Sequence, residues 1–118
     1  MKCFNPEITR EVILGSVTYI VNDKYYLKNF SAWDTSIRDW QAEREKVVLE
    51  SEHIEAINFI RQAFDKNNQH PVVRMIAAEL ANQFGIEKGT VKYFHKLFPG
   101  GIHQAFLIAG LPMQNSCC

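Results

Sequence analysis

Two adjacent cysteines, Cys117 and Cys118, stand at the C-terminal end of the sequence, and the third cysteine, Cys3, stands near the other end. A thiol on an exposed segment can ionise and attack or receive sulfur, whereas a buried thiol is usually inert. Cysteines at the two ends do not indicate an internal disulfide framework, so we expect reduced or redox-active thiols. We predict that Cys117 carries the chemistry, and a frayed terminus with incidental cysteines remains the alternative.

A second candidate site is the stretch from Ile76 to Phe98, which has the pattern of a helix-turn-helix around Gly85. Its second helix would present polar side chains that could contact phosphates and base edges, namely Lys88, Thr90, Lys92, His95 and Lys96. Any pair of crossing helices needs such a turn, however, and exposed lysines often serve only solvation. We favour this structural interpretation, because thirteen basic and thirteen acidic residues give zero formal net charge and predict weak DNA binding.

Other chemistries lack a pattern in this sequence. The four histidines, His53, His70, His95 and His103, are scattered without metal-ligand spacing, and no glycine-rich loop could cradle a phosphate. We therefore expect neither a metal nor an organic cofactor. Large aromatic residues are assigned to packing rather than to a ligand cage, namely Trp33, Trp40, Tyr25, Tyr26 and Tyr93.

The N-terminal part of the chain predicts a β-hairpin over residues 11 to 27. Val17, Tyr19 and Val21 alternate with period two, and Asn22-Asp23-Lys24 have the composition of the turn that follows them. An earlier short strand over residues 12 to 14, ended by Gly15-Ser16, would add to this sheet. A small sheet of this kind needs a helix packed on one face.

Five short helices are predicted to follow. Capping signals at Ser36 and Ser51, Pro71 in a first turn, and stops at Gly85 and Gly110 place them at about 36–46, 51–67, 71–84, 91–98 and 102–109. We expect the second of them to be the central helix of the core, and Pro112 prevents the last from continuing. The predicted fold is mainly α (α+β): one domain of residues 1–118, a hairpin and an orthogonal helix bundle, with 111–118 as a flexible arm.

No apolar segment has the length or flanking residues of a signal peptide or a membrane span. We therefore expect a cytoplasmic protein without a membrane partner.

An ordered series of short motifs runs from Gly15 to the end of the chain. It comprises Tyr26-Leu27 before Trp33, the helix opened by Ser51, Pro71-Val72-Val73-Arg74-Met75, Phe84-Gly85, Glu87-Lys88-Gly89, Tyr93, Leu97-Phe98-Pro99, Ile108-Ala109-Gly110-Leu111-Pro112 and Cys117. Through these residues the sequence resembles the DsrC/TusE family of small sulfur-carrier proteins. The resemblance implies a compact helical fold with an N-terminal hairpin and a mobile C-terminal arm.

The resemblance also implies a role for the penultimate cysteine, which is Cys117 here. An upstream sulfurtransferase converts this cysteine to a persulfide, and the sulfur then passes to a protein acceptor. Family members serve either 2-thiouridine formation in tRNA or dissimilatory sulfur metabolism, where a second cysteine eleven residues earlier permits an intramolecular disulfide or trisulfide. Phe106 occupies that earlier position in this sequence. The resemblance is therefore to the single-thiol, TusE-like branch.

Three further expectations follow from the resemblance. Cys118 could resolve a persulfide on Cys117, pair with it in a vicinal disulfide, or have no role. Arg74 matches the arginine that the family places near the arm's cysteine, so we predict that it stabilises the thiolate or persulfide, with a surface salt bridge as the alternative. The partners would be a protein donor and a protein acceptor of sulfur, and the chain alone would be a monomer. The rival hypothesis is a DNA-binding or regulatory helix-turn-helix module derived from this family.

Overall fold

The computed structural model describes residues 8–114, so Cys3, Cys117 and Cys118 lie outside the described residues. The first elements of the described residues are the two strands of an antiparallel hairpin, β1 (Thr9–Leu14) and β2 (Val17–Asn22), in the register that pairs Thr9 with Asn22 and Leu14 with Val17. Gly15 and Ser16 form the loop between them. Gly15 has a φ of 63°, and two-residue hairpin loops favour such positive values.

A turn forms at Asn22-Asp23-Lys24 as predicted, but it is not the turn of the hairpin, which lies at Gly15-Ser16. The Oδ1 atom of Asn22 accepts hydrogen bonds from the backbone N–H groups of Lys24 at 2.8 Å and Tyr26 at 3.0 Å, and the carbonyl of Asn22 accepts the N–H of Tyr25 at 2.9 Å. Side chain and backbone together therefore close this turn. After the turn the chain returns to β2 only through an isolated bridge between Val21 and Leu27. The short strand that was predicted as an addition is instead the full partner of β2.

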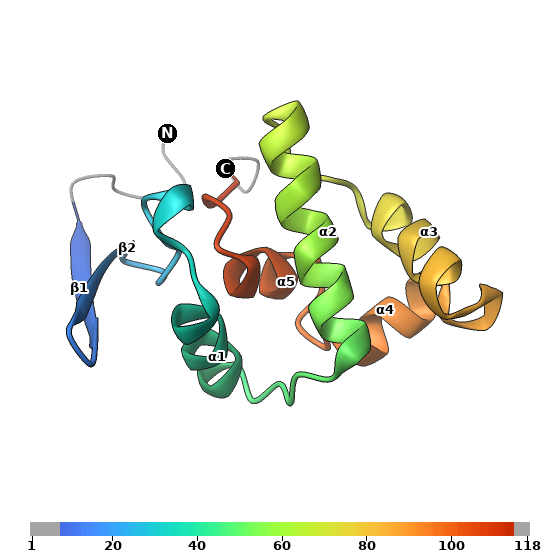
Figure 1. The fold of residues 1–118 in the computed structure, drawn as a ribbon, viewed down its shortest axis with the longest axis horizontal. Helices are drawn as coiled ribbons and strands as arrows, with labels where there is room; N and C mark the ends of the chain where they lie inside the picture. Colours follow the sequence, from blue (N-terminus) through green and yellow to red (C-terminus); the bar gives the residue numbers. More distant parts are fainter. Residues whose placement is uncertain (1–7, 115–118) are drawn as a thin grey trace.

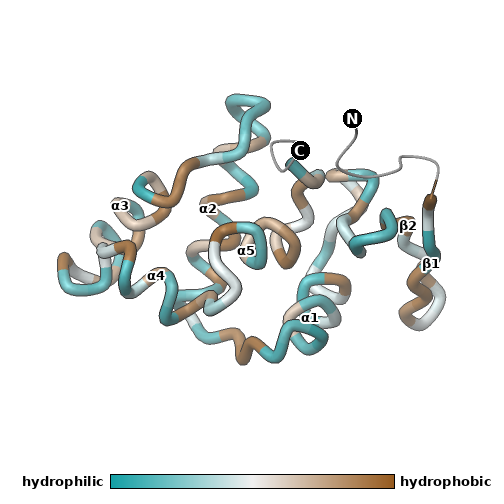
Figure 2. Tube along the Cα trace, turned by 180° about the vertical axis from the view of Figure 1, so that it is seen from behind, coloured by the Kyte–Doolittle hydropathy of each residue, from teal (hydrophilic) through white to brown (hydrophobic). Residues whose placement is uncertain are grey.

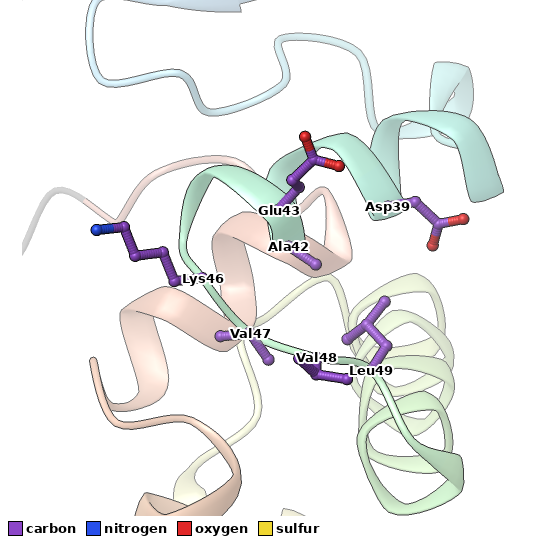
Figure 3. Close-up of a pocket in the computed structure, with 7 residues that line it drawn as sticks. All are labelled: Asp39, Ala42, Glu43, Lys46, Val47, Val48 and Leu49. Carbon is purple, nitrogen blue, oxygen red and sulfur yellow. The ribbon is translucent and has the colours of Figure 1, made fainter.

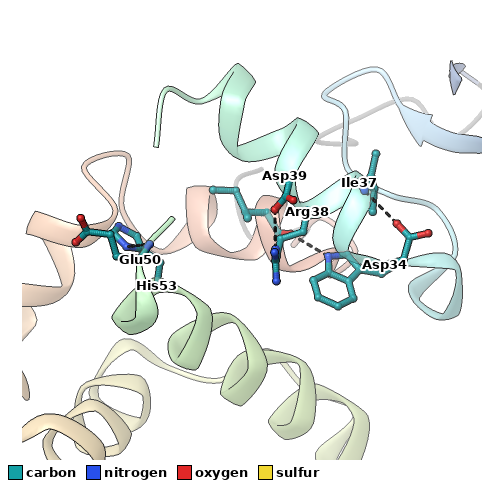
Figure 4. A network of polar contacts seen from close by, with 8 residues as sticks. Asp34, Ile37, Arg38, Asp39, Glu50 and His53 are labelled. Carbon is teal, nitrogen blue, oxygen red and sulfur yellow. Dashed lines mark hydrogen bonds and ion pairs between the residues drawn. The ribbon is translucent and has the colours of Figure 1, made fainter. Parts of the chain in front are cut away.

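The two α-helices that follow the hairpin have caps that differ from the predicted ones (Figure 4). The single-turn helix η1 (Phe30–Ala32) precedes α1 (Thr35–Arg44), which is capped by Asp34: its Oδ1 atom accepts the N–H of Ile37 at 3.1 Å. The helix α2 (Ser51–Asn67) is capped by Glu50, whose N–H donates to Nδ1 of His53 at 3.1 Å. Ser36 and Ser51 already lie in the first turns of these helices.

The remaining elements lie close to the predicted ranges. They are α3 (Val73–Phe84), the single-turn helix η2 (Ile86–Lys88), α4 (Val91–Leu97) and α5 (Ile102–Ala109). The predicted fold class, a hairpin followed by five helices, is confirmed. Within residues 8–114, no helix combines the length and the apolar character that crossing a bilayer requires.

The last helix lies at the centre of the molecule. Figure 1 shows α5 between α1 and α2, with α3 and α4 on the other side of α2 and the hairpin at the far end. Residues 105–109 of α5 are all buried, and Figure 2 shows apolar stretches in α5, whereas the end of α2 that leads to α3 is polar. The centre of the core is therefore α5, although the sequence pattern had favoured α2.

Within residues 8–114, two apolar clusters make up the core. The larger one joins the helices, and the smaller one lies between the hairpin and α1, where it contains Val12, Tyr19, Val21, Leu27 and Ile37. The indole of Trp33 packs against both clusters. This residue therefore connects the hairpin side of the molecule to the end of α5, from which the chain leaves toward Cys117.

Candidate functional site

The C-terminal end of α5 is the point from which the segment that carries Cys117 departs. Four carbonyl groups at the end of a helix lack intrahelical partners, and here each of the four receives a donor. The N–H of Leu111 donates to the carbonyl of Phe106 at 3.1 Å, and the N–H of Gly110 donates to that of Leu107 at 3.2 Å. These two bonds form a Schellman motif, which requires a left-handed residue directly after the helix.

Gly110 is that residue, with a φ of 78° and a ψ of 21°. A Cβ atom at this position would lie 2.3 Å from Cδ1 of Trp33 and 3.2 Å from Nη1 of Arg61. Glycine is therefore required twice, by the backbone conformation and by the close approach of two side chains. The next residue, Leu111, is fully buried in the larger cluster.

Side chains supply the other two donors at the end of α5. Nε1 of Trp33 donates to the carbonyl of Ile108 at 3.0 Å, and Nη1 of Arg61 donates to that of Ala109 at 2.9 Å. Trp33 follows η1, whereas Arg61 lies on α2. Two separate elements therefore hold the last turn of α5 in place.

The guanidinium of Arg61 makes further contacts around this point. Nη2 donates to the carbonyl of Phe30 at 3.0 Å, and the central carbon lies 3.9 Å from the ring centre of Phe30 and 4.2 Å from that of Trp33. Burial lowers the pKa of Arg61, while the nearby carboxylate of Asp65 acts in the opposite direction. A guanidinium stays charged under such conditions, so Arg61 places a fixed positive charge beside the base of the arm.

A third side chain binds the segment beyond α5. Nε2 of His70 lies 2.6 Å from the carbonyl oxygen of Pro112, and because a carbonyl only accepts, Nε2 must carry the hydrogen. The His70 ring meets Phe106 edge-on at 4.9 Å and Phe64 at 5.2 Å. We call Trp33, Arg61 and His70 the carbonyl clamp.

The position at which the resemblance expects a second cysteine thus holds a buried aromatic ring. Phe106 is 1% exposed and forms part of the surroundings of His70. Further along the chain, Nδ2 of Asn22 contacts Sδ of Met113 at 3.9 Å. Within residues 8–114 the three clamp side chains donate N–H groups to backbone carbonyls, so the reactive group of this site would be the thiol that the arm carries.

A shallow hollow lies next to the clamp. Its volume is about 340 Å³, and it is lined by Phe30, Ser31, Arg61, Gln62 and Asp65. A larger pocket of about 500 Å³ lies at the other end of α1, around the connection to α2. Figure 3 shows its apolar residues, among them Val47 and Val48, with Glu43 and Lys46 at its edge. In Figure 1 this connection and the described C-terminal end lie on opposite sides of the molecule, so the larger pocket does not adjoin the arm.

Arg74, the predicted stabiliser of the thiolate, lies in the first turn of α3 and is exposed. Within residues 8–114 it forms no ion pair, so its alternative role in a surface salt bridge gains no support. The role of Arg74 toward Cys117 stays a prediction, as does that of Cys118, because both cysteines lie outside the described residues.

Two of the predicted nucleic-acid contacts, Lys88 and Thr90, make bonds within the protein. Lys88 forms an ion pair with Glu52 at 2.5 Å, and the hydroxyl of Tyr93 donates to the same carboxylate at 3.3 Å. Thr90 caps α4 by accepting the N–H of Tyr93 at 3.0 Å. Lys92 and Lys96 are exposed on α4.

Sequence reasoning missed most of the clamp. Trp33 was assigned to packing, and neither Arg61 nor His70 was linked to the arm. The available signal was an arginine directly after the buried Ile60 on the patterned helix, which is unusual but not specific. The motif Gly110-Leu111-Pro112, in contrast, correctly indicated where the helix ends.

Known proteins match this chain over most of its length. A family model described as "DsrC like protein" matches residues 14–118. The protein named "Sulfurtransferase TusE" from Photorhabdus laumondii is 41% identical over 93 residues, which cover 78% of this chain and 84% of the relative. The protein of the same name from Escherichia coli is also 41% identical, over 78% of this chain and 85% of its own.

Solved structures agree with the sequence relatives. The NMR structure of DsrC from Allochromatium vinosum has a TM-score of 0.81 and 30% identity, and the match covers 94% of this chain and all of that one. The crystal structure of the oxidised gamma-subunit of the dissimilatory sulfite reductase (DsrC) from Archaeoglobus fulgidus has a TM-score of 0.83 and 25% identity, over 92% of this chain and 100% of its own. No relative or solved structure named here is described as a DNA-binding protein.

Proposed function

Because the chain belongs to the DsrC-like family, whose model matches residues 14–118, we propose that it is a sulfur-relay protein that carries persulfide sulfur on Cys117. That match is the observation that carries the proposal, since it includes Cys117 and the clamped base of its segment. The names of the relatives, sulfurtransferase and sulfite reductase subunit, support a role in sulfur transfer.

The reaction is a thiol–persulfide exchange. The thiolate of Cys117 attacks the outer sulfur of a persulfide on the donor protein, the donor's sulfur–sulfur bond breaks, and the donor cysteine leaves as a thiolate. Cys117 then holds the persulfide, and an acceptor thiolate takes the outer sulfur by the same exchange. No net oxidation occurs, so neither step needs a cofactor.

The chain would act as a carrier between partners rather than as a catalyst that works alone. Its clamp donates to the carbonyls at the base of the arm, and we propose that activation of the thiol depends on the partners or on Arg74. We propose that Arg74 stabilises the thiolate or persulfide anion, because its exposed guanidinium forms no ion pair within residues 8–114. We propose that the chain acts as a monomer between one donor and one acceptor.

The arm itself is also part of the proposal. The sequence predicts an arm of residues 111–118 on a single domain. The buried side chain of Leu111 and the bonded carbonyl of Pro112 support a base that extends through Met113. We propose that the moving part is the remainder, which includes Cys117 and Cys118.

Loading kinetics test the proposal. The chain is mixed with a persulfidated protein donor, such as a cysteine desulfurase charged with L-cysteine, and the bound sulfur is measured over time by intact mass. We expect wild type and Cys118→Ser to gain one sulfur atom, while Cys117→Ser gains none. If Cys117→Ser gains sulfur as fast as wild type does, Cys117 is not the carrier.

A complementation experiment separates the two uses that the resemblance implies. The chain is expressed in a bacterial strain that lacks its own TusE-type protein, and 2-thiouridine is measured in the tRNA. Restoration by wild type but not by Cys117→Ser assigns the chain to tRNA thiolation. If the wild-type chain is present at normal levels and is loaded normally but does not restore 2-thiouridine, the result favours a role in dissimilatory sulfur metabolism.

A further inference from the structure

His70 differs from the other two members of the carbonyl clamp in what it binds. Trp33 and Arg61 hold carbonyls of α5 itself, whereas His70 donates to the carbonyl of Pro112 at 2.6 Å, in the segment that leads to Cys117. His70 lies in the connection between α2 and α3. A contact between this connection and Pro112 therefore determines where the segment leaves the domain.

The direction of the His70 ring is fixed from several sides. Phe106 and Phe64 meet the ring edge-on, at 4.9 Å and 5.2 Å between ring centres. Pro71 follows directly and is buried, and a residue before proline is confined to extended conformations. The ring therefore cannot turn away from Pro112 without losing packing against two aromatic side chains.

We propose that His70, supported by Phe106, is a positioning residue for the relay: it holds Pro112 and thereby sets the point and direction from which the Cys117 segment departs. This inference rests on the proposed function. Cys117 follows Pro112 by five residues, which span at most about 18 Å when extended. A shift of the pivot at Pro112 therefore displaces the whole volume within which the sulfur can meet a partner.

Phe106 acquires a role through this contact. A second cysteine at this position would join the arm to the domain by a covalent bond that depends on redox state. The buried phenyl ring instead packs against the side chain that holds Pro112, and this contact involves no redox chemistry. In this chain, the contact that holds the base of the arm therefore does not depend on a reductant.

The test uses the full chain with three substitutions. His70→Ala removes the donor, whereas His70→Gln keeps an N–H donor close to the position of Nε2. His103→Ala is the matched control, because His103 also faces Phe106, at 6.1 Å, but is exposed and its side chain forms no hydrogen bond within residues 8–114. The heteronuclear NOE of the Met113 and Gln114 amides reports the mobility of the base. Loading from the persulfidated donor gives kcat and KM, and iodoacetamide alkylation of Cys117, located by peptide mapping, reports the thiol itself.

For His70→Ala we expect a lower NOE at Met113 and a kcat for loading that falls by about 3- to 10-fold. KM for the donor and the alkylation rate should change by less than about 2-fold, because neither the docking surface nor the thiol is altered. His70→Gln should recover most of the loss, and His103→Ala should behave as wild type.

Two results would overturn the inference: a His70→Ala protein with wild-type NOE values and loading, or a His70→Gln protein that loses as much as His70→Ala does. A wild-type chain that never becomes loaded contradicts the proposed function instead, whatever the relaxation data show. The two failures are therefore distinguishable.

Discussion

At the scale of single residues, the base of the arm depends on side-chain hydrogen-bond donors that bind three backbone carbonyls. Trp33, Arg61 and His70 donate to the carbonyls of Ile108, Ala109 and Pro112. Buried or half-buried carbonyls that lose such partners cost free energy, so each donor both stabilises the fold and orients the chain. The clamp can hold this geometry only because Gly110 leaves room for the indole of Trp33.

Replacing Gly110 by alanine should therefore destabilise the protein by about 2–4 kcal/mol, because a strained φ and a clash with Trp33 act together. The matched control is Gly15→Ala: Gly15 also has a positive φ, but no atom lies within 4 Å of a Cβ placed there. That control should lose only about 1 kcal/mol. Urea denaturation at equal m-values measures both, and equal losses would contradict the close contact with Trp33.

The sequence identified some residues of this region and could not identify others. Glycine followed shortly by proline is a local stop signal, so the end of α5 was predictable from Gly110 and Pro112. Arg61 and His70, in contrast, lie 48 and 42 residues from the carbonyls that they bind. No local pattern records a contact over such a distance, and these residues required the tertiary structure.

At the scale of elements, local signals placed the helices well and their caps less well. The helix of residues 102–109 was predicted at its observed bounds, because apolar residues and two glycines delimit it. The caps at Asp34 and Glu50 were missed, because serine and acidic residues compete as acceptors within one turn. The turn of the hairpin was misplaced for a similar reason: Gly15-Ser16 and Asn22-Asp23-Lys24 both have turn composition, and only strand pairing decides between them.

The ion pair between Glu52 on α2 and Lys88 on η2 should make the stability of the protein depend on pH. The Lys88 ammonium, hydrogen-bonded to Glu52, lowers the pKa of that carboxyl to about 2 in the folded protein. A lowered pKa means that the contribution is fully present above the ordinary carboxyl pKa of about 4.3 and is lost as pH falls toward 2. The stability advantage of wild type over Glu52→Gln should therefore shrink between pH 5 and 2.

Urea denaturation over this pH range measures the advantage directly. Glu43→Gln is a suitable control, because Glu43 is exposed and its carboxylate forms no bond within residues 8–114. The control should follow wild type closely. A constant difference between wild type and Glu52→Gln at all pH values would show that the ion pair with Lys88 does not hold the carboxylate charged.

At the scale of the whole molecule, the core continues past the last helix. Leu111, which follows α5 by two residues, is 0% exposed and belongs to the apolar cluster that joins the helices. The arm is therefore attached to the centre of the protein rather than to a peripheral helix. Movement of the segment beyond this point need not disturb the domain.

Two truncations test where the domain ends. A chain of residues 1–114 should retain the stability of the full chain within about 1 kcal/mol, since the described core lies within it. A chain of residues 1–110 loses Leu111 and the bond between His70 and Pro112, and it should lose at least about 3 kcal/mol. Equal stability of the two truncated chains would place the boundary before Leu111.

The central claim, that Cys117 carries sulfur between proteins, is tested most directly by locating the sulfur. The chain is loaded in a single turnover by a persulfidated donor protein, alkylated and digested, and its peptides are analysed by mass spectrometry before and after an acceptor thiol protein is added. We predict one additional sulfur on Cys117, which disappears when the acceptor is present. Additional sulfur on Cys3 or Cys118 alone, with Cys117 unmodified, would contradict the account.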